Sequence, residues 1–347
     1  MVVETDLLTT PFTKLVGCKV PIQQAGMGPL ANPKLVSAVT NAGALGMLSG
    51  MVIDSVDLLE RVLREVKDST TGPFGVNYIV PLMERGELEQ MVPVAARYAR
   101  VVEFFYGWPD ESLVQMVHQE KTLVSWQVGS KEEAKAAADT GCDLIVAQGI
   151  EAGGHIRGQI GLLPLLSETI EAIGGKVPII GAGGIGTGRS MAGVLAAGAS
   201  AVRVGTRFVA SEEAQAHPDY VNALVNAEAK DTIYTDRFNV EWPIRASHRV
   251  LRSSLEAASN FKGEVVGTSS NIYTQKKYDI HCFEEAVPMK HSTGNIEAMP
   301  HWAGESVGGV KRLQPASEIV RELNDDAEKT LIRWGNKIES QTVQQPV

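Results

Sequence analysis

Short apolar runs alternate with amphipathic stretches along roughly the first 210 residues of the chain. Each apolar run ends in a glycine-rich or polar turn, which is typical of a fully buried strand. The stretches between the runs carry helix signals: Asn32 stands before Pro33 as an N-cap, and Gly43, Gly141 and Gly198 follow helical stretches as left-handed ends. The pattern therefore predicts a repeated unit of strand, turn and helix.

Eight strands are predicted in this region. They span Pro21–Gln24, Leu45–Leu48, Phe74–Tyr78, Val101–Tyr106, Leu123–Gln127, Leu144–Ala147, Pro178–Gly181 and Ala201–Gly205. Strands that alternate with helices form a parallel sheet, and eight such units close into a (β/α)8 TIM barrel of the α/β class. A doubly wound open sheet is the alternative, but units of similar spacing leave no topological switch for it.

The pattern changes after the eighth strand. Residues 211–260 are expected to be mostly helical, with helices over Tyr220–Ala229 and Arg245–Ala258, while residues 261–310 show little periodicity. A strong helical pattern returns over Pro315–Lys337. We therefore expect three parts: a barrel over residues 1–210, a smaller, mostly helical lid or substrate domain over 211–310, and a C-terminal segment over 311–347 whose helix packs back on the barrel.

The composition limits the class of protein. Hydrophobic residues make up 44% of the chain and charged residues 21%, as in an ordinary soluble enzyme. A net charge of −9 argues against nucleic acid and anionic membrane as partners, because phosphate contacts need clustered Lys and Arg. No CxxC pair occurs among the three cysteines, Cys18, Cys142 and Cys282, so neither a disulfide framework nor a metal site is expected. With an acidic N-terminus and no apolar run of about 18 residues, a cytoplasmic protein is expected.

The most informative stretch is residues 143–158. A short apolar strand leads into a loop in which Gln148, Glu151, His155 and Arg157 lie among four glycines. Barrel enzymes build their active sites from such loops at the carboxyl ends of the strands. The free pKa of histidine lies near neutrality, so His155 is the best candidate for a catalytic base. A purely structural hydrogen bond from His155 to a loop carbonyl is the alternative.

The last two strand loops contain closely spaced glycines: Gly181, Gly183 and Gly184 in one, Gly205 with Thr206 in the other. In barrels these loops commonly bind a phosphate through backbone N–H groups. The first loop also matches the dinucleotide pattern GxGxxG, but the following strand lacks the acidic residue that this pattern expects. A barrel phosphate site is the preferred interpretation, and glycines needed only for tight turns are the alternative.

Amide side chains stand at the ends of four other strands, at Gln24, Asn77, Gln127 and Gln148, and Met27 lies in the first of these loops. Because an amide both donates and accepts, this set suits the edge of a flavin pyrimidine, which alternates carbonyl and N–H groups. Each amide alone could simply cap a loop. Together they predict a site for a flat heterocyclic cofactor.

Two further sets of residues are given weaker roles. His281, His291 and His301 are ten residues apart, which has no metal-ligand logic, and they are assigned to the surface of the lid. Arg245, Arg249 and Arg252 are assigned either to a solvated helix face or to the phosphorylated tail of a substrate.

These motifs together resemble the nitronate monooxygenase family, whose members are FMN-dependent β/α barrels. The resemblance covers most of the chain and is carried by Pro21–Gly28, Asn41–Gly46, Phe74–Asn77, Gln148–His155, Gly181–Ile185 and Gly205–Phe208. The run Glu-Ala-Gly-Gly-His, which ends at His155, is the most specific of them.

The resemblance implies that FMN is the cofactor and that His155 is the catalytic base or orients the substrate. The expected FMN-binding residues are Gln24, Ala25, Met27, Asn77, Gln127, Gln148, Ala152, Gly153, Gly154, Gly181, Gly183, Gly184, Gly205 and Thr206. It further implies a small-molecule substrate, an alkyl nitronate, that is oxidised with O2 to a carbonyl compound and nitrite. Assembly into a homo-oligomer stays open.

Two departures from the family pattern keep a second activity open. Ile156 is inserted between His155 and Arg157, and Gly26 precedes Met27 where well-behaved nitronate oxidisers have another motif. The second feature looks more like NAD(P)H-dependent quinone reductases and flavin enoyl-thioester reductases, so NAD(P)H is the alternative electron donor. A flavin-binding protein without turnover and a flavin-free barrel that handles a sugar phosphate or nucleotide are the remaining alternatives.

Overall fold

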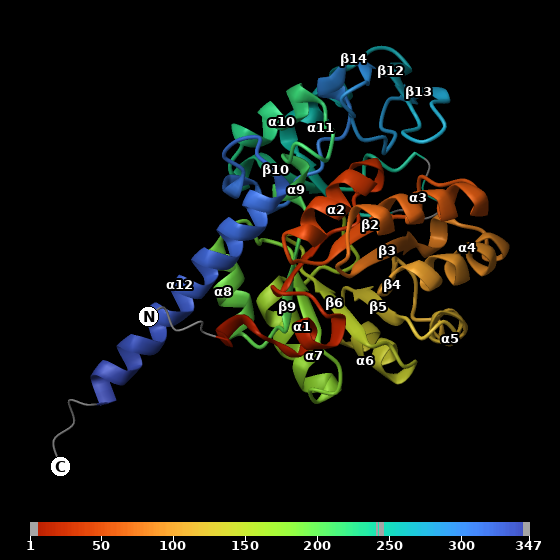
Figure 1. Cartoon of the computed structure of the whole chain (residues 1–347). Coiled ribbons are helices and arrows are strands. Elements are labelled where there is room, and N and C mark those ends of the chain that lie inside the picture. Colours follow the sequence, from red (N-terminus) through yellow and green to blue (C-terminus); the bar gives the residue numbers. More distant parts are fainter. Residues whose placement is uncertain (1–5, 241, 243–245, 343–347) are drawn as a thin grey trace.

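The centre of the molecule is a closed barrel of parallel strands (Figure 1). The computed structural model describes residues 6–240, 242 and 246–342, with side chains for 7–240, 242 and 246–335. Its large sheet contains β1 (Ile22–Gln24), β2 (Gly46–Ser49), β3 (Phe74–Ile79), β4 (Val101–Phe105), β5 (Leu123–Val128), β6 (Leu144–Gln148), β8 (Ile179–Ala182) and β9 (Ala201–Val204). A parallel bridge between Gln23 and Leu45 joins the two ends of this sheet. The predicted TIM barrel is confirmed.

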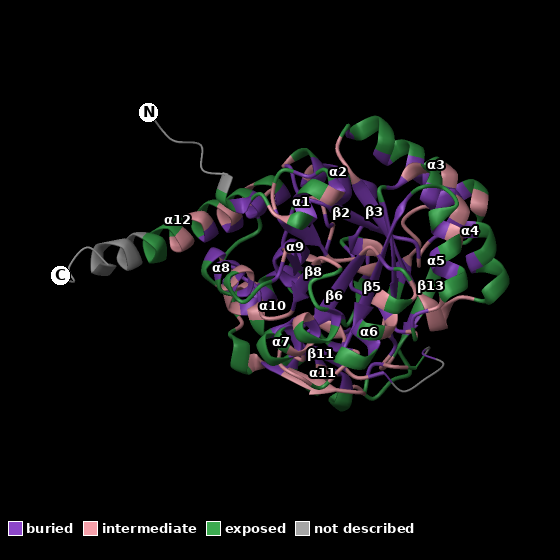
Figure 2. Cartoon of the chain, turned by 90° about the horizontal axis from the view of Figure 1, so that it is seen from below, coloured by how far each residue is buried: buried purple, intermediate pink, exposed green. Residues whose placement is uncertain are grey.

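Helices flank the strands of the barrel, and the helix after Asn32 begins where the sequence indicated. They are α1 (Pro11–Val16), α2 (Pro33–Asn41), α3 (Val56–Ser69), α4 (Arg85–Tyr98), α5 (Glu111–His118), α6 (Lys131–Asp139), α7 (Leu162–Ile173), α8 (Gly188–Ala196) and α9 (Thr206–Val209). The Asn32 side chain accepts hydrogen bonds from the first turn of α2, and Gly43 ends that helix region with a φ of 95°. Figure 2 shows the strands buried inside this ring of helices, whose outer faces are exposed.

The inside of the barrel changes character along its axis. Its lower part is apolar and is formed by Leu45, Met47, Val101, Leu123, Leu144, Val146, Ile180 and Ala201. Phe12 of α1 is fully buried in the same cluster and closes the amino-terminal end. Closer to the carboxyl ends, the buried residues Gln23, Glu103, Ser125 and Arg203 are polar or charged. The barrel therefore has an apolar floor and a polar layer beneath its mouth.

Residues 211–310 form the cap segment, which lies over the carboxyl ends of the strands (Figure 1). It contains α10 (Pro218–Val225), α11 (Arg252–Asn260), β10 (Thr232–Thr235), β11 (His248–Leu251), β12 (Val265–Ser270), β13 (Lys277–His281) and β14 (Thr293–Gly294). The segment was expected to be mostly helical, and the structure adds to its helices the strands of two small sheets. The expected helix over Arg245–Ala258 begins only at Arg252, since the preceding residues pair as β11; Arg245 lies outside the described residues.

Short 3-10 helices connect several of these elements. They are η1 (Asp6–Leu8), η2 (Gly28–Leu30), η3 (Val80–Leu82), η4 (Ala229–Asp231), η5 (Ile296–Ala298) and η6 (Glu305–Gly309). One further strand, β7 (Gly154–His155), lies in the loop after β6 and pairs antiparallel with β11 of the cap segment. This pairing joins the loop of His155 to the cap.

The C-terminal helix α12 (Ala316–Thr342) packs along α8 and α2, as predicted, and its later turns extend beyond the barrel (Figure 1). The contact with α8 is close: a Cβ atom on Gly188 would lie 2.3 Å from the Cβ atom of Asp326. Within the described residues, no helix is long and apolar enough to cross a membrane.

Candidate active site

A cavity of about 630 Å³ lies at the carboxyl ends of the strands, between the barrel and the cap segment. Most of the predicted site residues line it: Ala25, Met27, Asn77, Gln127, Gln148, Ala152, Gly153, Gly154, His155, Gly183, Gly184, Gly205 and Thr206. They come from loops that are far apart in the sequence and that the closed barrel brings to one end. The cap contributes the opposite wall, including Asn271, Tyr278 and Glu285.

Two predicted site residues do not line the cavity, and both have structural roles instead. The Oε1 atom of Gln24 accepts the N–H of Met47 at 2.9 Å, so this buried amide joins β1 to β2. At Gly181, a Cβ atom would lie 2.5 Å from Cγ1 of Val194, so the glycine allows α8 to pack on β8. Contact of these two residues with the cofactor stays a prediction that the cavity lining does not support.

His155 lies in an apolar, aromatic environment at the wall of the cavity. Its ring centroid is 3.9 Å from that of Trp242, and its Nε2 atom is buried with no hydrogen-bond partner among the described residues. Burial lowers the pKa of His155 well below its ordinary value, and His248 lowers it further. The imidazole is therefore neutral at pH 7 and can accept a proton. The alternative, a hydrogen bond from its side chain to a loop carbonyl, is not seen in the described part of the chain.

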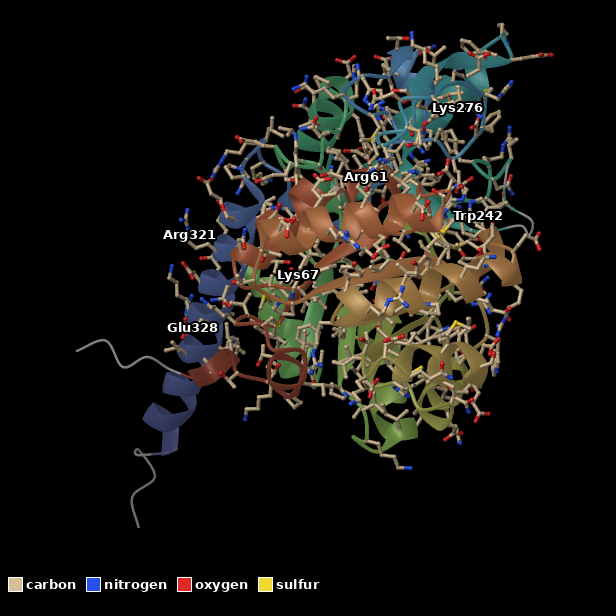
Figure 3. The ribbon with its side chains drawn as sticks, turned by 45° about the vertical axis from the view of Figure 1, so that its right-hand side comes forward. Arg61, Lys67, Trp242, Lys276, Arg321 and Glu328 are labelled. Carbon is tan, nitrogen blue, oxygen red and sulfur yellow. The ribbon has the colours of Figure 1, made fainter. Side chains whose placement is uncertain are left out.

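The cap segment supplies groups next to His155 that the sequence did not reveal. Glu285 places its Oε2 atom 3.9 Å from His155 Nε2, and the indole N–H of Trp242 donates to the same Glu285 oxygen. Trp242, labelled in Figure 3, lies where the cap meets the barrel. These residues follow no periodic pattern in the sequence, so only the tertiary structure brings them together.

His248 is a fully buried neighbour of His155. Its Nε2 atom accepts the backbone N–H of Phe238 at 3.2 Å, so the proton is on Nδ1 and is donated to the carbonyl of Ala246 at 3.0 Å. Burial lowers the pKa of His248 to about 4. This imidazole is neutral and its nitrogens are both occupied, so it supports the wall of the site and is no second base.

The side chain of Gln148 holds the loop that carries His155 through backbone groups of that loop. Gln148 donates from Nε2 to the carbonyl of His155 at 2.9 Å and accepts the N–H of Arg157 at its Oε1 atom at 3.1 Å. The Arg157 guanidinium in turn pairs with Glu133 at 2.7 Å. Although Gln148 lines the cavity, its amide is already used to position this loop.

Arg249 fixes the other side of the same loop. The predictions of a solvated face or a phosphate contact do not describe it, because its side chain is 9% exposed. It donates from Nε and Nη2 to the carbonyl of Ile150, at 3.2 and 3.0 Å, and pairs with Glu305 at 3.2 Å. Arg249 is thus a structural link between the cap segment and the loop after β6.

His301 also differs from its prediction. It was assigned to the lid surface, but only 2% of it is exposed. The ring stacks on Tyr220 with centroids 4.8 Å apart, and Nε2 hydrogen-bonds the carbonyl of Ile296 at 3.1 Å. The apolar packing of the cap provides this environment. Burial lowers the pKa of His301 to about 4.

The glycines after β8 and β9 form a concave backbone surface in the cavity. Gly183 and Gly184 are successive left-handed residues, with φ angles of 109° and 70°. Such a turn points neighbouring N–H groups toward one spot and favours an anion. Gly205 stands just before α9, and the hydroxyl of Thr206 accepts the N–H of Gly304 at 3.0 Å. These features suit the predicted phosphate site.

A network of buried side chains lies beneath the cavity. Glu103 pairs with Nη1 of Arg203 at 2.5 Å and accepts the Nδ2 of Asn77 at 2.9 Å, the Nε2 of Gln23 at 3.0 Å and the Oγ hydroxyl of Ser125 at 3.3 Å. Both Asn77 and Arg203 line the cavity. The sequence prediction missed Glu103 and Arg203, although each is a charged residue within an otherwise apolar strand, and that interruption was the signal.

Metal-ligating side chains are not clustered in the part of the chain that the structure describes. Within it, no group of three or more His, Cys, Asp and Glu side chains is arranged to hold a metal ion.

The closed barrel, with its glycine turn and amide-lined cavity, defines the class of the protein: a β/α barrel with a cavity at the carboxyl ends of its strands. The family model described as "Nitronate monooxygenase" matches residues 9–326, so the chain belongs to the nitronate monooxygenase family and is an FMN-dependent oxidoreductase.

Relatives and solved structures with different names are similar to this chain. The protein named "(3aS,4S,5R,7aS)-5-hydroxy-7a-methyl-1-oxo-octahydro-1H-indene-4-carboxyl-CoA dehydrogenase" from Mycobacterium tuberculosis is 33% identical over 262 residues, which cover 74% of this chain and 71% of the relative. The nitronate monooxygenase of Pseudomonas aeruginosa is 28% identical, covering 92% and 99%.

Two solved structures cover nearly the whole fold. FabK from Thermotoga maritima superposes with a TM-score of 0.76 at 28% identity, covering 94% of this chain and 99% of that one. The nitroalkane oxidase of Streptomyces ansochromogenes gives a TM-score of 0.73 at 27% identity, covering 92% and 98%. The proteins that are similar to this chain thus carry names that point to different substrates.

Proposed function

We propose that the cavity at the barrel mouth binds FMN. The glycine turn at Gly183 and Gly184 offers backbone N–H groups to the phosphate, and Asn77, Gln127 and Arg203 offer hydrogen-bonding side chains to the ring system. At Gly205, a Cβ atom would meet only Ala25 and Met27, at 3.5 and 3.8 Å, so the cavity keeps open space there. When bound, FMN would accept electrons from the substrate and pass them to an acceptor.

We further propose that the protein oxidises nitroalkanes and their nitronates, with O2 as the final acceptor and a carbonyl compound and nitrite as products. One observation carries this proposal: the buried, neutral Nε2 atom of His155 is without a hydrogen-bond partner in the described structure and stands at the wall of the cavity. A neutral imidazole in this position takes the α-proton of a nitroalkane. The imidazolium that forms then holds the nitronate anion beside it.

A second candidate is a dehydrogenase or reductase that acts on an acyl thioester and uses NAD(P)H or its oxidised form. One feature favours it: Gly26 precedes Met27, where the sequence departs from the pattern of nitronate oxidisers toward that of the flavin reductases. The names of two similar proteins, a carboxyl-CoA dehydrogenase and FabK, support the same candidate.

An anaerobic titration separates the two candidates. The purified protein is loaded with FMN, and its visible spectrum is recorded after addition of a nitronate, a neutral nitroalkane, NADH or NADPH, each alone. Under the first proposal the nitro compounds bleach the flavin and the nicotinamides do not. Bleaching by a nicotinamide alone would replace it by the second candidate, and a protein that takes up no FMN would overturn both.

A further inference from the structure

The polar layer of the barrel, formed by Gln23, Asn77, Glu103, Ser125 and Arg203, is unusual for the interior of a TIM barrel. Bulky branched side chains ordinarily fill such layers. Here Glu103 is 0% exposed, and the Arg203 side chain that pairs with it is 7% exposed. Removing both charges from water is costly, and a well-packed apolar pair would often be as stable. Stability is therefore a weak explanation for this charge pair.

The pair instead controls which groups face the cavity. Only the Nδ2 side of the Asn77 amide can donate to the Glu103 carboxylate, so Oδ1 is turned away from it. Gly26 lies against that oxygen, because a Cβ atom on Gly26 would be 2.8 Å from Asn77 Oδ1. This contact also accounts for the glycine before Met27. Asn77 thus presents an acceptor at the cavity.

Arg203 supplies the complementary group. Its Nη1 atom is bound by Glu103, and no other hydrogen bond joins the guanidinium to the described residues, so its remaining N–H donors are available at the cavity wall. A fixed acceptor on β3 and a fixed cationic donor on β9 face one cavity from different sides of the barrel. This arrangement matches a planar ring whose edge carries both N–H and carbonyl groups and which becomes more negative on reduction.

We propose that Arg203 binds the pyrimidine edge of the flavin and raises its reduction potential, and that Glu103 is a positioning residue that orients Arg203 and Asn77 and moderates the cationic charge. This inference rests on the proposed binding of FMN. A guanidinium at this edge stabilises the reduced, more negative flavin over the oxidised one, whereas the carboxylate behind it opposes that preference.

The test is the midpoint potential of the bound flavin, measured by spectroelectrochemistry on the FMN-loaded wild-type protein and the variants Arg203→Gln, Arg203→Lys and Glu103→Gln. We expect Arg203→Gln to lower the potential, corresponding to about a tenfold loss of affinity for reduced relative to oxidised FMN, the effect of one charge-assisted hydrogen bond. Arg203→Lys keeps the charge and should stay close to wild type. Glu103→Gln leaves the guanidinium charge unopposed and should raise the potential.

Opposite shifts for Arg203→Gln and Glu103→Gln are the signature of charge, because loss of structure alone would not move the potential in two directions. Equal potentials for Arg203→Gln and Arg203→Lys would overturn the inference, and this comparison decides it even if Glu103→Gln fails to fold. A wild-type protein that binds no FMN would instead contradict the proposed function, so the two failures are distinguishable.

Discussion

At the scale of single residues, the proposed chemistry depends on an imidazole that is neutral and whose Nε2 atom has no hydrogen-bond partner among the described residues. His155 is surrounded by Trp242, Trp302 and His248, and this burial favours the uncharged form. An imidazole of this kind is unprotonated at pH 7 and can accept a proton, whereas a substrate that has already lost its proton does not need a base. Loss of His155 should therefore change the turnover of a neutral nitroalkane and that of a preformed nitronate by different amounts.

We expect His155→Gln to reduce kcat for a neutral nitroalkane by about 10²- to 10⁴-fold, the range for removal of a general base. The same variant should lose much less activity with the nitronate, which has already lost its proton. Steady-state kinetics with both forms of one substrate measure the contrast, and bound FMN measured by absorbance checks that the cofactor is retained. Equal losses with both forms would show that His155 orients the substrate and is not its base.

A site residue could be predicted from the sequence only where the residues next to it mark its position. Glycines at strand ends and the His155 loop stand out because buried parallel strands are apolar throughout, so polar groups accumulate where they end. Gln24 and Gln148 looked like cofactor ligands for the same reason, yet their amides bond backbone groups. Trp242 and Glu285 could not be found, because only packing of the cap brings them to His155.

At the scale of elements, β7 and β11 form the joint between the barrel and the cap segment. His155 is paired with His248, and Gly154 with Arg249. Arg249 reinforces the joint through the carbonyl of Ile150 and through Glu305. The joint, rather than His155 alone, determines where the base stands.

Replacing Arg249 by Gln should loosen this joint. Loss of its charge-assisted hydrogen bonds is expected to cost about 1–3 kcal/mol in the free energy of unfolding and to lower kcat, because the His155 loop loses an anchor. Chemical denaturation and steady-state kinetics measure the two effects. Arg252→Gln, at an exposed position on α11, is the matched control and should change stability by less than about 0.5 kcal/mol. Similar behaviour of the two variants would contradict the role given to Arg249.

The seam between α8 and α12 allows a second prediction at this scale. In Gly188→Ala the new Cβ atom would meet Asp326 Cβ at 2.3 Å and the backbone nitrogen of Ala327 at 2.6 Å, so α12 must move. We expect a loss of about 1–3 kcal/mol in the free energy of unfolding, typical of overpacking. Gly193→Ala on the same helix meets nothing within 4 Å and should be neutral or stabilising by about 0.5–1 kcal/mol. Equal stability of the two variants would show that the seam adapts.

The strands of the barrel were predicted well and those of the cap were missed. Barrel strands are buried on both faces and read as continuous apolar runs. The strands β12 and β13 are half exposed, with polar residues such as Thr268 and Lys277, and their partners decide their structure more than their own composition does. The helix expected from Arg245 was shortened for the same reason, because pairing with β7 and β10 outweighed its helical pattern.

At the scale of the whole molecule, buried histidines make stability depend on pH. Burial lowers the pKa values of His248 and His301 to about 4, below the unfolded value near 6.5. The unfolded chain therefore binds more protons between pH 6.5 and 4, and stability falls as the pH drops through that window. The contribution is fully present above pH 6.5.

We expect each of these two histidines to reduce the free energy of unfolding by about 2 kcal/mol between pH 7.5 and pH 5. Urea unfolding at the two pH values measures the difference. In His301→Gln the decrease in the free energy of unfolding between the two pH values should be smaller by about 2 kcal/mol. In His291→Gln, at an exposed site, the decrease should be the same as in the wild-type protein. An unchanged drop in His301→Gln would mean that this imidazole is already protonated in the folded protein at pH 5.

The hairpin of β12 and β13 is a part of the cavity wall that is separate from the loops of His155 and of the glycine turn. It lines the cavity through Ser270, Asn271 and Tyr278, and a hydrogen bond of 3.1 Å from the Asn271 side chain to the Val52 carbonyl ties it to the barrel. The base and the anion turn belong to other loops. A change in this hairpin would therefore alter which molecules the cavity admits, while the residues proposed to hold the cofactor and take the proton keep their positions.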